Sequence, residues 1–181
     1  MSLSTIILAA GKSTRMLSLK SKLLFKISGD PIIDHVYRTA KSISSNEIIC
    51  VLGDSPKELL DFVKKNKLKT VSQKNPCGTA DAVKIAIKSK TVKNNNKILI
   101  LCGDVPFISS KSLKVIIKKT NNNDLCLGTT LLENPSGYGR IVRQNNNIIK
   151  IVEEKDANNK IKKINEVNTG ILCIKEGVLR K

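Results

Sequence analysis

The sequence has no tryptophan and only one histidine, and just 3% of its 181 residues are aromatic. Few rings are therefore available for stacking on nucleic-acid bases. No apolar run approaches the ~20 residues that span a bilayer. The first run, residues 6–10, is short for a signal peptide, and no basic segment precedes it. We therefore expect a cytoplasmic protein with neither a membrane nor a nucleic acid as partner.

Closely spaced cysteines are also missing. None of the five lies at the spacing of a zinc or redox motif. Four of them lie within apolar runs, where cysteine packs as a small hydrophobic residue. An odd number of unpaired thiols suits a reducing compartment. We therefore assign no catalytic role to Cys50, Cys77, Cys102, Cys126 or Cys173.

Acidic residues are few. There are 15 of them against 32 lysines and arginines, which gives a formal net charge of +17. Such an excess can mark a nucleic-acid-binding protein. Here the lysines are spread through every segment and accompany asparagine clusters at residues 94–96, 121–123 and 145–147. We interpret the excess of lysine, asparagine and isoleucine as the drift of an AT-rich genome, and keep charge-driven nucleic-acid binding as a less favoured alternative.

Three short apolar runs, at residues 5–11, 47–53 and 97–103, each end in glycine. Their length and their content of isoleucine, valine and leucine predict strands that are buried on both faces of a parallel sheet. Helical patterns lie between and after them: one starts at a capping box at residues 55–58, a second spans 79–89, and a third begins near Ser110. The alternation predicts an α/β, Rossmann-like fold, with a mostly parallel sheet and helices on both faces.

The pattern changes after about Asn123. Residues 124–132 predict another strand, residues 138–143 and 147–153 predict a small β-hairpin insertion, and residues 166–174 predict a final strand. An asparagine-rich turn would close the hairpin, since asparagine tolerates the positive φ of tight turns. There is no linker and no repeat, so we expect residues 1–181 to form a single domain.

The segment after the first predicted strand combines small residues with cations. Ligands of doubly wound sheets bind at the carboxyl ends of strands, and a turn of small residues can hold phosphate oxygens on its N–H groups. Lys12, Arg15 and Lys22 follow Gly11 and could neutralise a triphosphate. The segment is no P-loop, which would need glycine in place of Ile6, and no dinucleotide fingerprint, which needs three spaced glycines. A plain basic turn is the alternative interpretation.

Five segments in order along the chain form the most specific pattern. They are LAAGKSTRM at 8–16 with Lys22 and GDPI at 29–32, Gln73 with GTADAV at 78–83, GDVP at 103–106, NPSGYGRIVR at 134–143, and IVEEKDA at 151–157 with EVNTGI at 166–171. Their order and spacing resemble the sugar-phosphate nucleotidyltransferases of the MobA-like NTP transferase group. Among these, the uridylyltransferase domain of the bacterial N-acetylglucosamine-1-phosphate uridylyltransferases is the most similar, and the resemblance runs nearly end to end.

The resemblance implies an enzyme that joins UTP and N-acetylglucosamine 1-phosphate to give UDP-N-acetylglucosamine, a cell-wall precursor, and pyrophosphate. It implies Mg²⁺ as cofactor, held by Asp104, and a catalytic set of Arg15, Lys22 and Asp104. It further implies nucleotide contacts from Leu8, Ala9, Ala10, Gly11, Lys22, Gln73, Gly78, Thr79 and Asp104, and sugar contacts from Gly139, Glu153 and Asn168. This set suits the chemistry, because two anions must meet and catalysis rests on charge neutralisation and in-line positioning.

Three features depart from the family pattern. Ser21 replaces the usual proline before Lys22, and Pro76 and Cys77 stand where the family commonly has glutamine and leucine. The chain also stops at Lys181. We therefore expect a domain that is incomplete at its C-terminus, with no β-helix acetyltransferase domain and no asparagine to serve as second metal ligand. From such a chain we expect weak activity or none.

Two other functions stay open. One is a nucleotidyltransferase of the same fold with another nucleotide or acceptor, for example a molybdopterin cytidylyltransferase-like enzyme. The first glycine turn suits that group, whereas GYGRIV at 137–142 does not. The other is a non-catalytic remnant that still binds a nucleotide. The sequence carries no signal for an oligomeric state.

Overall fold

The computed structural model describes residues 2–11, 21–43, 47–74, 78–89 and 97–179. Their contacts divide the chain into two compact units, Met1–Cys126 with Leu172–Lys181, and Leu127–Ile171. Strand β10 (Glu166–Lys175) begins in the second unit and ends in the first. None of the helices in the described ranges is long and apolar enough to cross a membrane.

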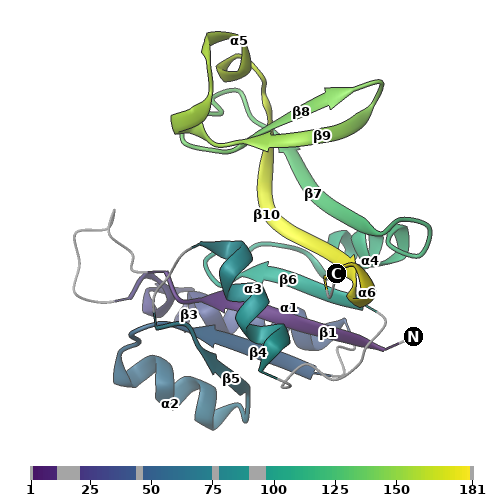
Figure 1. Cartoon of the computed structure of the whole chain (residues 1–181). Coiled ribbons are helices and arrows are strands. Elements are labelled where there is room, and N and C mark those ends of the chain that lie inside the picture. The colour runs from purple at the N-terminus through teal and green to yellow at the C-terminus, as the bar shows by residue number, and fades with distance from the viewer. Residues whose placement is uncertain (1, 12–20, 44–46, 75–77, 90–96, 180–181) are drawn as a thin grey trace. The chain divides into compact units, whose positions relative to one another are not determined.

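The first unit is built on a sheet in the order β5-β4-β1-β6, with the end of β10 beside β6 (Figure 1). Strands β5, β4, β1 and β6 run parallel, and β10 pairs with β6 in the antiparallel sense. The parallel strands are β1 (Leu3–Ala9), β4 (Glu47–Leu52), β5 (Lys69–Ser72) and β6 (Lys97–Cys102). The predicted mostly parallel sheet is confirmed, although the sequence pattern missed the short edge strand β5.

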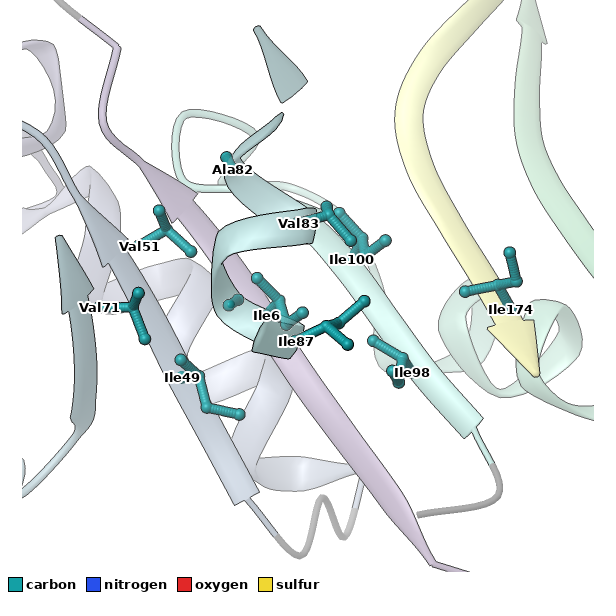
Figure 2. Close-up of a cluster of buried hydrophobic side chains, with 11 residues drawn as sticks. Ile6, Ile49, Val51, Val71, Ala82, Val83, Ile87, Ile98, Ile100 and Ile174 are labelled. Carbon is teal, nitrogen blue, oxygen red and sulfur yellow. The ribbon is translucent and has the colours of Figure 1, made fainter. Parts of the chain in front are cut away.

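The central strands are apolar at nearly every position because helices cover both faces of the sheet. Ile6 and Ile7 are neighbours in β1, so their side chains point to opposite faces, and both are fully buried. Figure 2 shows Ile6 packed under α3 (Thr79–Lys88) in a cluster with Ile49 and Ile100. Figure 1 shows α1 (Ile32–Ser42), which contributes the buried Ile33, behind the sheet. The predicted Rossmann-like α/β arrangement is confirmed.

Helix α2 (Lys57–Lys65) begins later than the sequence pattern predicts. Pro56 is its N-cap, and the Pro56 carbonyl accepts the N–H groups of Leu59 and Leu60 at 3.0 and 3.2 Å. The capping box expected from Ser55 is therefore wrong, because the cap position falls on a proline that has no side-chain acceptor. The third predicted helix is α4 (Ser110–Lys119), where the Ser109 hydroxyl accepts the N–H of Ser112.

Short elements complete the first unit. They are the 3-10 turn η2 (Lys22–Leu24), strands β2 (Lys26–Ile27) and β3 (Asp30–Pro31), and helix α6 (Glu176–Leu179).

The second unit contains the predicted hairpin. Strands β8 (Arg140–Gln144) and β9 (Asn147–Val152) are antiparallel and are joined by Asn145 and Asn146, whose φ angles are 47° and 66°. Both asparagines thus adopt the left-handed conformation that the turn requires. The unit also holds η3 (Glu154–Asp156), α5 (Asn159–Lys162) and most of β7 (Leu125–Leu131).

Candidate functional site

The backbone at the end of β1 is held closely between the two neighbouring strands. A Cβ atom placed on Gly53 would lie 2.8 Å from the Ala10 carbonyl oxygen, and one placed on Gly103 would lie 2.9 Å from the Leu8 carbonyl oxygen. The Gly103 N–H also donates to that Leu8 oxygen at 3.0 Å. The glycines that follow β4 and β6 therefore fix the course of the chain from Leu8 to Gly11, where the sequence predicts a phosphate-binding turn.

A cavity of about 340 Å³ opens beside this turn. All nine residues expected to contact the nucleotide line it, although they come from four separate stretches of sequence. Arg15, expected in the catalytic set, lies outside the described residues. The cavity is lined by Leu8, Ala9, Ala10, Gly11, Lys22, Leu23, Gln73, Gly78, Thr79, Ala82, Cys102 and Asp104.

Lys22 and Asp104 form an ion pair in the lining of this cavity. The Lys22 Nζ donates to the Asp104 Oδ2 at 2.5 Å, and the two side chains are 28% and 38% exposed. This partial exposure leaves both charges within reach of a ligand. A triphosphate entering here would meet a cation and a carboxylate side by side, which is the pairing that a metal–phosphate complex needs.

Gln73 also lines this cavity and is only 2% exposed. Its backbone N–H donates to the Leu52 carbonyl at 2.7 Å, and its Nε2 donates to Asp81 Oδ2 at 2.6 Å and to the Gly78 carbonyl at 3.4 Å. Gly78 is the N-cap of α3 with φ of 108°, a conformation that favours glycine. Thr79 is the first helical residue, and its side chain faces solvent at the cavity edge.

In the second unit, the three residues expected to contact the sugar also come together. The Asn168 N–H donates to the Gly139 carbonyl at 2.8 Å. A Cβ atom on Gly139 would lie 3.2 Å from Glu153 Oε1 and 3.0 Å from Ile151 Cγ2, so a side chain there would push the carboxylate aside. Glycine at this position therefore leaves the Glu153 carboxylate in place beside the Gly139 backbone.

An ion pair between a buried arginine and a partly exposed glutamate lies next to the residues expected to contact the sugar. The Arg140 side chain is 1% exposed and pairs with Glu154 Oε2 through Nη2 at 2.7 Å, and it also donates to the Tyr138 carbonyl. Glu154 in turn accepts the Gly137 N–H at 3.0 Å. The Arg140 guanidinium, followed by the Gly137 N–H, holds the pKa of Glu154 below its usual range. Residues 140 and 154 thus fix the segments that carry their neighbours, residues 139 and 153.

Comparison with known families decides what this arrangement is. The model of the MobA-like NTP transferase domain matches residues 5–139, most of the chain. The chain belongs to this family. The predicted resemblance to nucleotidyltransferases is therefore confirmed, and the cavity at the end of β1 is the part of a MobA-like NTP transferase where a nucleotide is expected.

This MobA-like NTP transferase also has individual relatives of higher sequence similarity. It is 42% identical over 166 residues to the bifunctional protein GlmU of Buchnera aphidicola subsp. Acyrthosiphon pisum (strain Tuc7), covering 92% of this chain and 36% of the relative. It is 38% identical over 182 residues to the bifunctional protein GlmU of Francisella tularensis subsp. novicida (strain U112), covering 100% of this chain and 39% of the relative. The chain thus spans little more than a third of the length of these relatives.

Solved structures share the fold at lower sequence identity. A Bacillus anthracis protein assigned as a glucose-1-phosphate thymidylyltransferase, in complex with sucrose, superposes with a TM-score of 0.82 at 21% identity, covering 99% of this chain and 74% of that one. A CMP:2-keto-3-deoxy-manno-octonic acid synthetase in complex with CTP gives a TM-score of 0.74 at 17% identity, covering 99% and 76%. Both confirm the nucleotidyltransferase fold.

Membership of the MobA-like NTP transferases generally implies a divalent metal ion together with a nucleotide substrate. Among the described residues, no three His, Cys, Asp or Glu side chains gather around one point. The Asp104 carboxylate nevertheless fits a hard cation, since it faces the cavity, is partly exposed and already holds one cation, Lys22. A site of this kind completes its coordination with water and substrate phosphates.

Sequence reasoning missed three residues that line the cavity, Leu23, Ala82 and Cys102. They are apolar or thiol side chains whose only signal is their position beside predicted site residues. The pKa of the Cys102 thiol is raised to about 11, chiefly by burial and also by the charge of Asp104, against the opposing effect of Lys22. Cys102 is therefore a protonated, unreactive part of the wall.

Proposed function

We propose that this chain is a uridylyltransferase that joins UTP and N-acetylglucosamine 1-phosphate, releasing pyrophosphate and forming UDP-N-acetylglucosamine. The observation that carries the proposal is the cavity of about 340 Å³ where the β1 turn, the Lys22–Asp104 pair and Gln73 meet. The likeness to bifunctional GlmU proteins, at 38–42% identity over nearly the whole chain, supports the choice of substrates.

The proposed reaction is an in-line displacement at phosphorus. An oxygen of the sugar phosphate forms a bond to the α-phosphorus of UTP, the bond to the β-phosphate oxygen breaks, and pyrophosphate leaves with the electron pair. A phosphate monoester is already a competent nucleophile, so no general base is needed. The task left to the protein is to bring two anions together and to hold them in line.

The residues of the nucleotide cavity divide this task. The backbone from Leu8 to Gly11 approaches the nucleotide closely because it carries small residues. Lys22 would turn from Asp104 to the phosphates and neutralise charge there. Asp104 would hold Mg²⁺, which supplies Lewis-acid stabilisation of the phosphate oxygens when bound. Gln73 would recognise the base, and Arg15 is proposed as a further phosphate cation.

The second unit supplies the groups proposed for the sugar. The Glu153 carboxylate can accept hydrogen bonds from sugar hydroxyls, and the Asn168 side-chain amide can both donate hydrogen bonds to polar groups of the sugar and accept them. Gly139 keeps space beside that carboxylate, where any larger residue would collide with it. The expected sugar contacts thus have a shared setting in the fold, which supports an amino-sugar phosphate as acceptor.

The test is pyrophosphate release by the purified chain with UTP, N-acetylglucosamine 1-phosphate and Mg²⁺, together with mass-spectrometric detection of UDP-N-acetylglucosamine. We expect product only when all three are present, and a loss of about 100-fold or more in Asp104→Ala. Asp61→Ala, which removes an exposed carboxylate on α2, is the matched control and should leave the rate unchanged. Product formation that needs CTP in place of UTP, or that survives in Asp104→Ala, would contradict the proposal.

A further inference from the structure

The orientation of the Gln73 amide is fixed by a residue that lines no part of the cavity. Gln73 Nε2 lies 2.6 Å from Asp81 Oδ2 in the first turn of α3. An ionised carboxylate can only accept hydrogen bonds, so the group it contacts must be the amide nitrogen. Rotating the amide by half a turn would place two oxygen acceptors against each other, which a site with 2% exposure cannot relieve with water.

The second amide hydrogen also has an acceptor, the Gly78 carbonyl at 3.4 Å. Both donors of the Gln73 side chain are thus directed at the protein. No donor from the described residues reaches the Gln73 Oε1. What this side chain can offer a ligand in the cavity is therefore a carbonyl oxygen, a pure acceptor.

We propose that Asp81 is a specificity-determining residue, which locks the Gln73 amide so that only its Oε1 faces the base. This inference rests on the proposed function, because it takes the base to be held at Gln73. The fixed acceptor pairs with a base that carries N–H at ring position 3, as uracil does. Cytosine has a lone pair at that position, so the same oxygen meets an acceptor and the base is rejected.

Asp81 acts here through Gln73 and is a positioning residue. Its carboxylate carries a negative charge near a site for an anion, so removing it can raise the affinity for every nucleotide. The ratio of two dissociation constants cancels that shared effect. The quantity to measure is therefore the Kd for CTP divided by the Kd for UTP, obtained by calorimetry with the full chain and Mg²⁺.

The decisive variant is Asp81→Asn, which keeps the shape of the side chain and adds a donor. The Gln73 amide can then turn either way, and we expect the CTP-to-UTP ratio to fall by about 10-fold or more. Asp61→Asn makes the same change on an exposed face of α2 and should leave the ratio unchanged. An unaltered ratio in Asp81→Asn, with its thermal unfolding like that of the wild type, would overturn the inference.

A second measurement needs only the wild-type chain. The triphosphate of 3-methyluridine lacks the N3 hydrogen, so its affinity should drop to that of CTP; affinity equal to that of UTP would overturn the role of the fixed acceptor. If the wild type binds UTP selectively and only the Asp81 tests fail, the proposed function stands without the inference. If the wild type binds no UTP, both are overturned.

Discussion

Replacing Gly103 with alanine tests how tightly the end of β6 packs against β1. The new Cβ would lie 2.9 Å from the Leu8 carbonyl oxygen, 3.2 Å from Ile33 Cδ1 and 3.3 Å from Leu23 Cδ2. Ile33 and Leu23 are buried, and Leu8 pairs with strands on both sides, so the neighbours have little freedom to move. All three contacts are closer than a methyl group ordinarily makes.

The expected magnitude follows from two opposing effects. Overpacking a rigid site costs about 1–3 kcal/mol. Alanine also restricts the unfolded chain, which returns about 0.4–1 kcal/mol. The net loss in the free energy of unfolding is therefore about 1–2 kcal/mol, or roughly 2–8 °C in Tm for a chain of this size. Because the Leu8 carbonyl must shift, the affinity for UTP should fall as well.

The assay is urea unfolding followed by far-UV circular dichroism, with UTP titration in parallel. Gly177→Ala is the matched control: it adds the same methyl group in α6, where nothing in the described part of the chain lies within 4 Å, and should be neutral or slightly stabilising. A Gly103→Ala chain as stable as the wild type would refute the reasoning, since it would mean that the β1 end is free to move.

Three further predictions concern charge. The pKa of Glu154 lies below its usual value near 4.5, mainly because of Arg140. The stability that ionised Glu154 contributes is therefore present above pH 4.5 and is lost as the pH falls through the folded-state pKa. Between about pH 5 and about pH 3, Tm should accordingly drop less in Glu154→Gln than in the wild type. Burial raises the pKa of Cys50 to about 12 and, together with nearby charge, that of Cys102 to about 11, so peptide mapping after iodoacetamide treatment at about pH 8 should find both unmodified until denaturant is added. Lys22→Met should bind Mn²⁺ several-fold more tightly without nucleotide, measured by electron paramagnetic resonance, because an ammonium group no longer neutralises the neighbouring carboxylate; equal affinity would show that the two cations do not compete.

The sequence predicted the strands β1, β4 and β6, and the edge of the sheet at which the cavity opens, because one rule governs both. Buried parallel strands are nearly continuous apolar runs, and their carboxyl ends meet at one edge of the sheet. Asp104, which follows the strand ending at Gly103, was thereby expected near Gly11, although dozens of residues separate the two along the chain. Gln73 was expected there only through the family resemblance, because the sequence pattern missed β5. The GlmU-like motifs then assigned the expected roles.

The differences among the three strand-end glycines could not be predicted. In the sequence Gly11, Gly53 and Gly103 look alike, yet among the described residues only the last two have neighbours that exclude a Cβ, namely Ala10 and Leu8. Such contacts depend on which strands become neighbours. The hydrogen bond from Gln73 to Asp81 could not be predicted from the sequence either, because the two residues belong to different parts of the chain, one after β5 and one in α3.

The turn at Asn145 and Asn146 between β8 and β9 shows where a bias toward A and T in the gene is compatible with the backbone conformation. Every glycine codon begins with GG, whereas asparagine is encoded by AAU and AAC. At Asn145 and Asn146 the backbone needs only a left-handed φ, which asparagine supplies, so drift toward A and T can proceed there without strain. At Gly103 the neighbouring atoms leave no room for a Cβ, so only glycine fits, and no AT-rich codon encodes glycine.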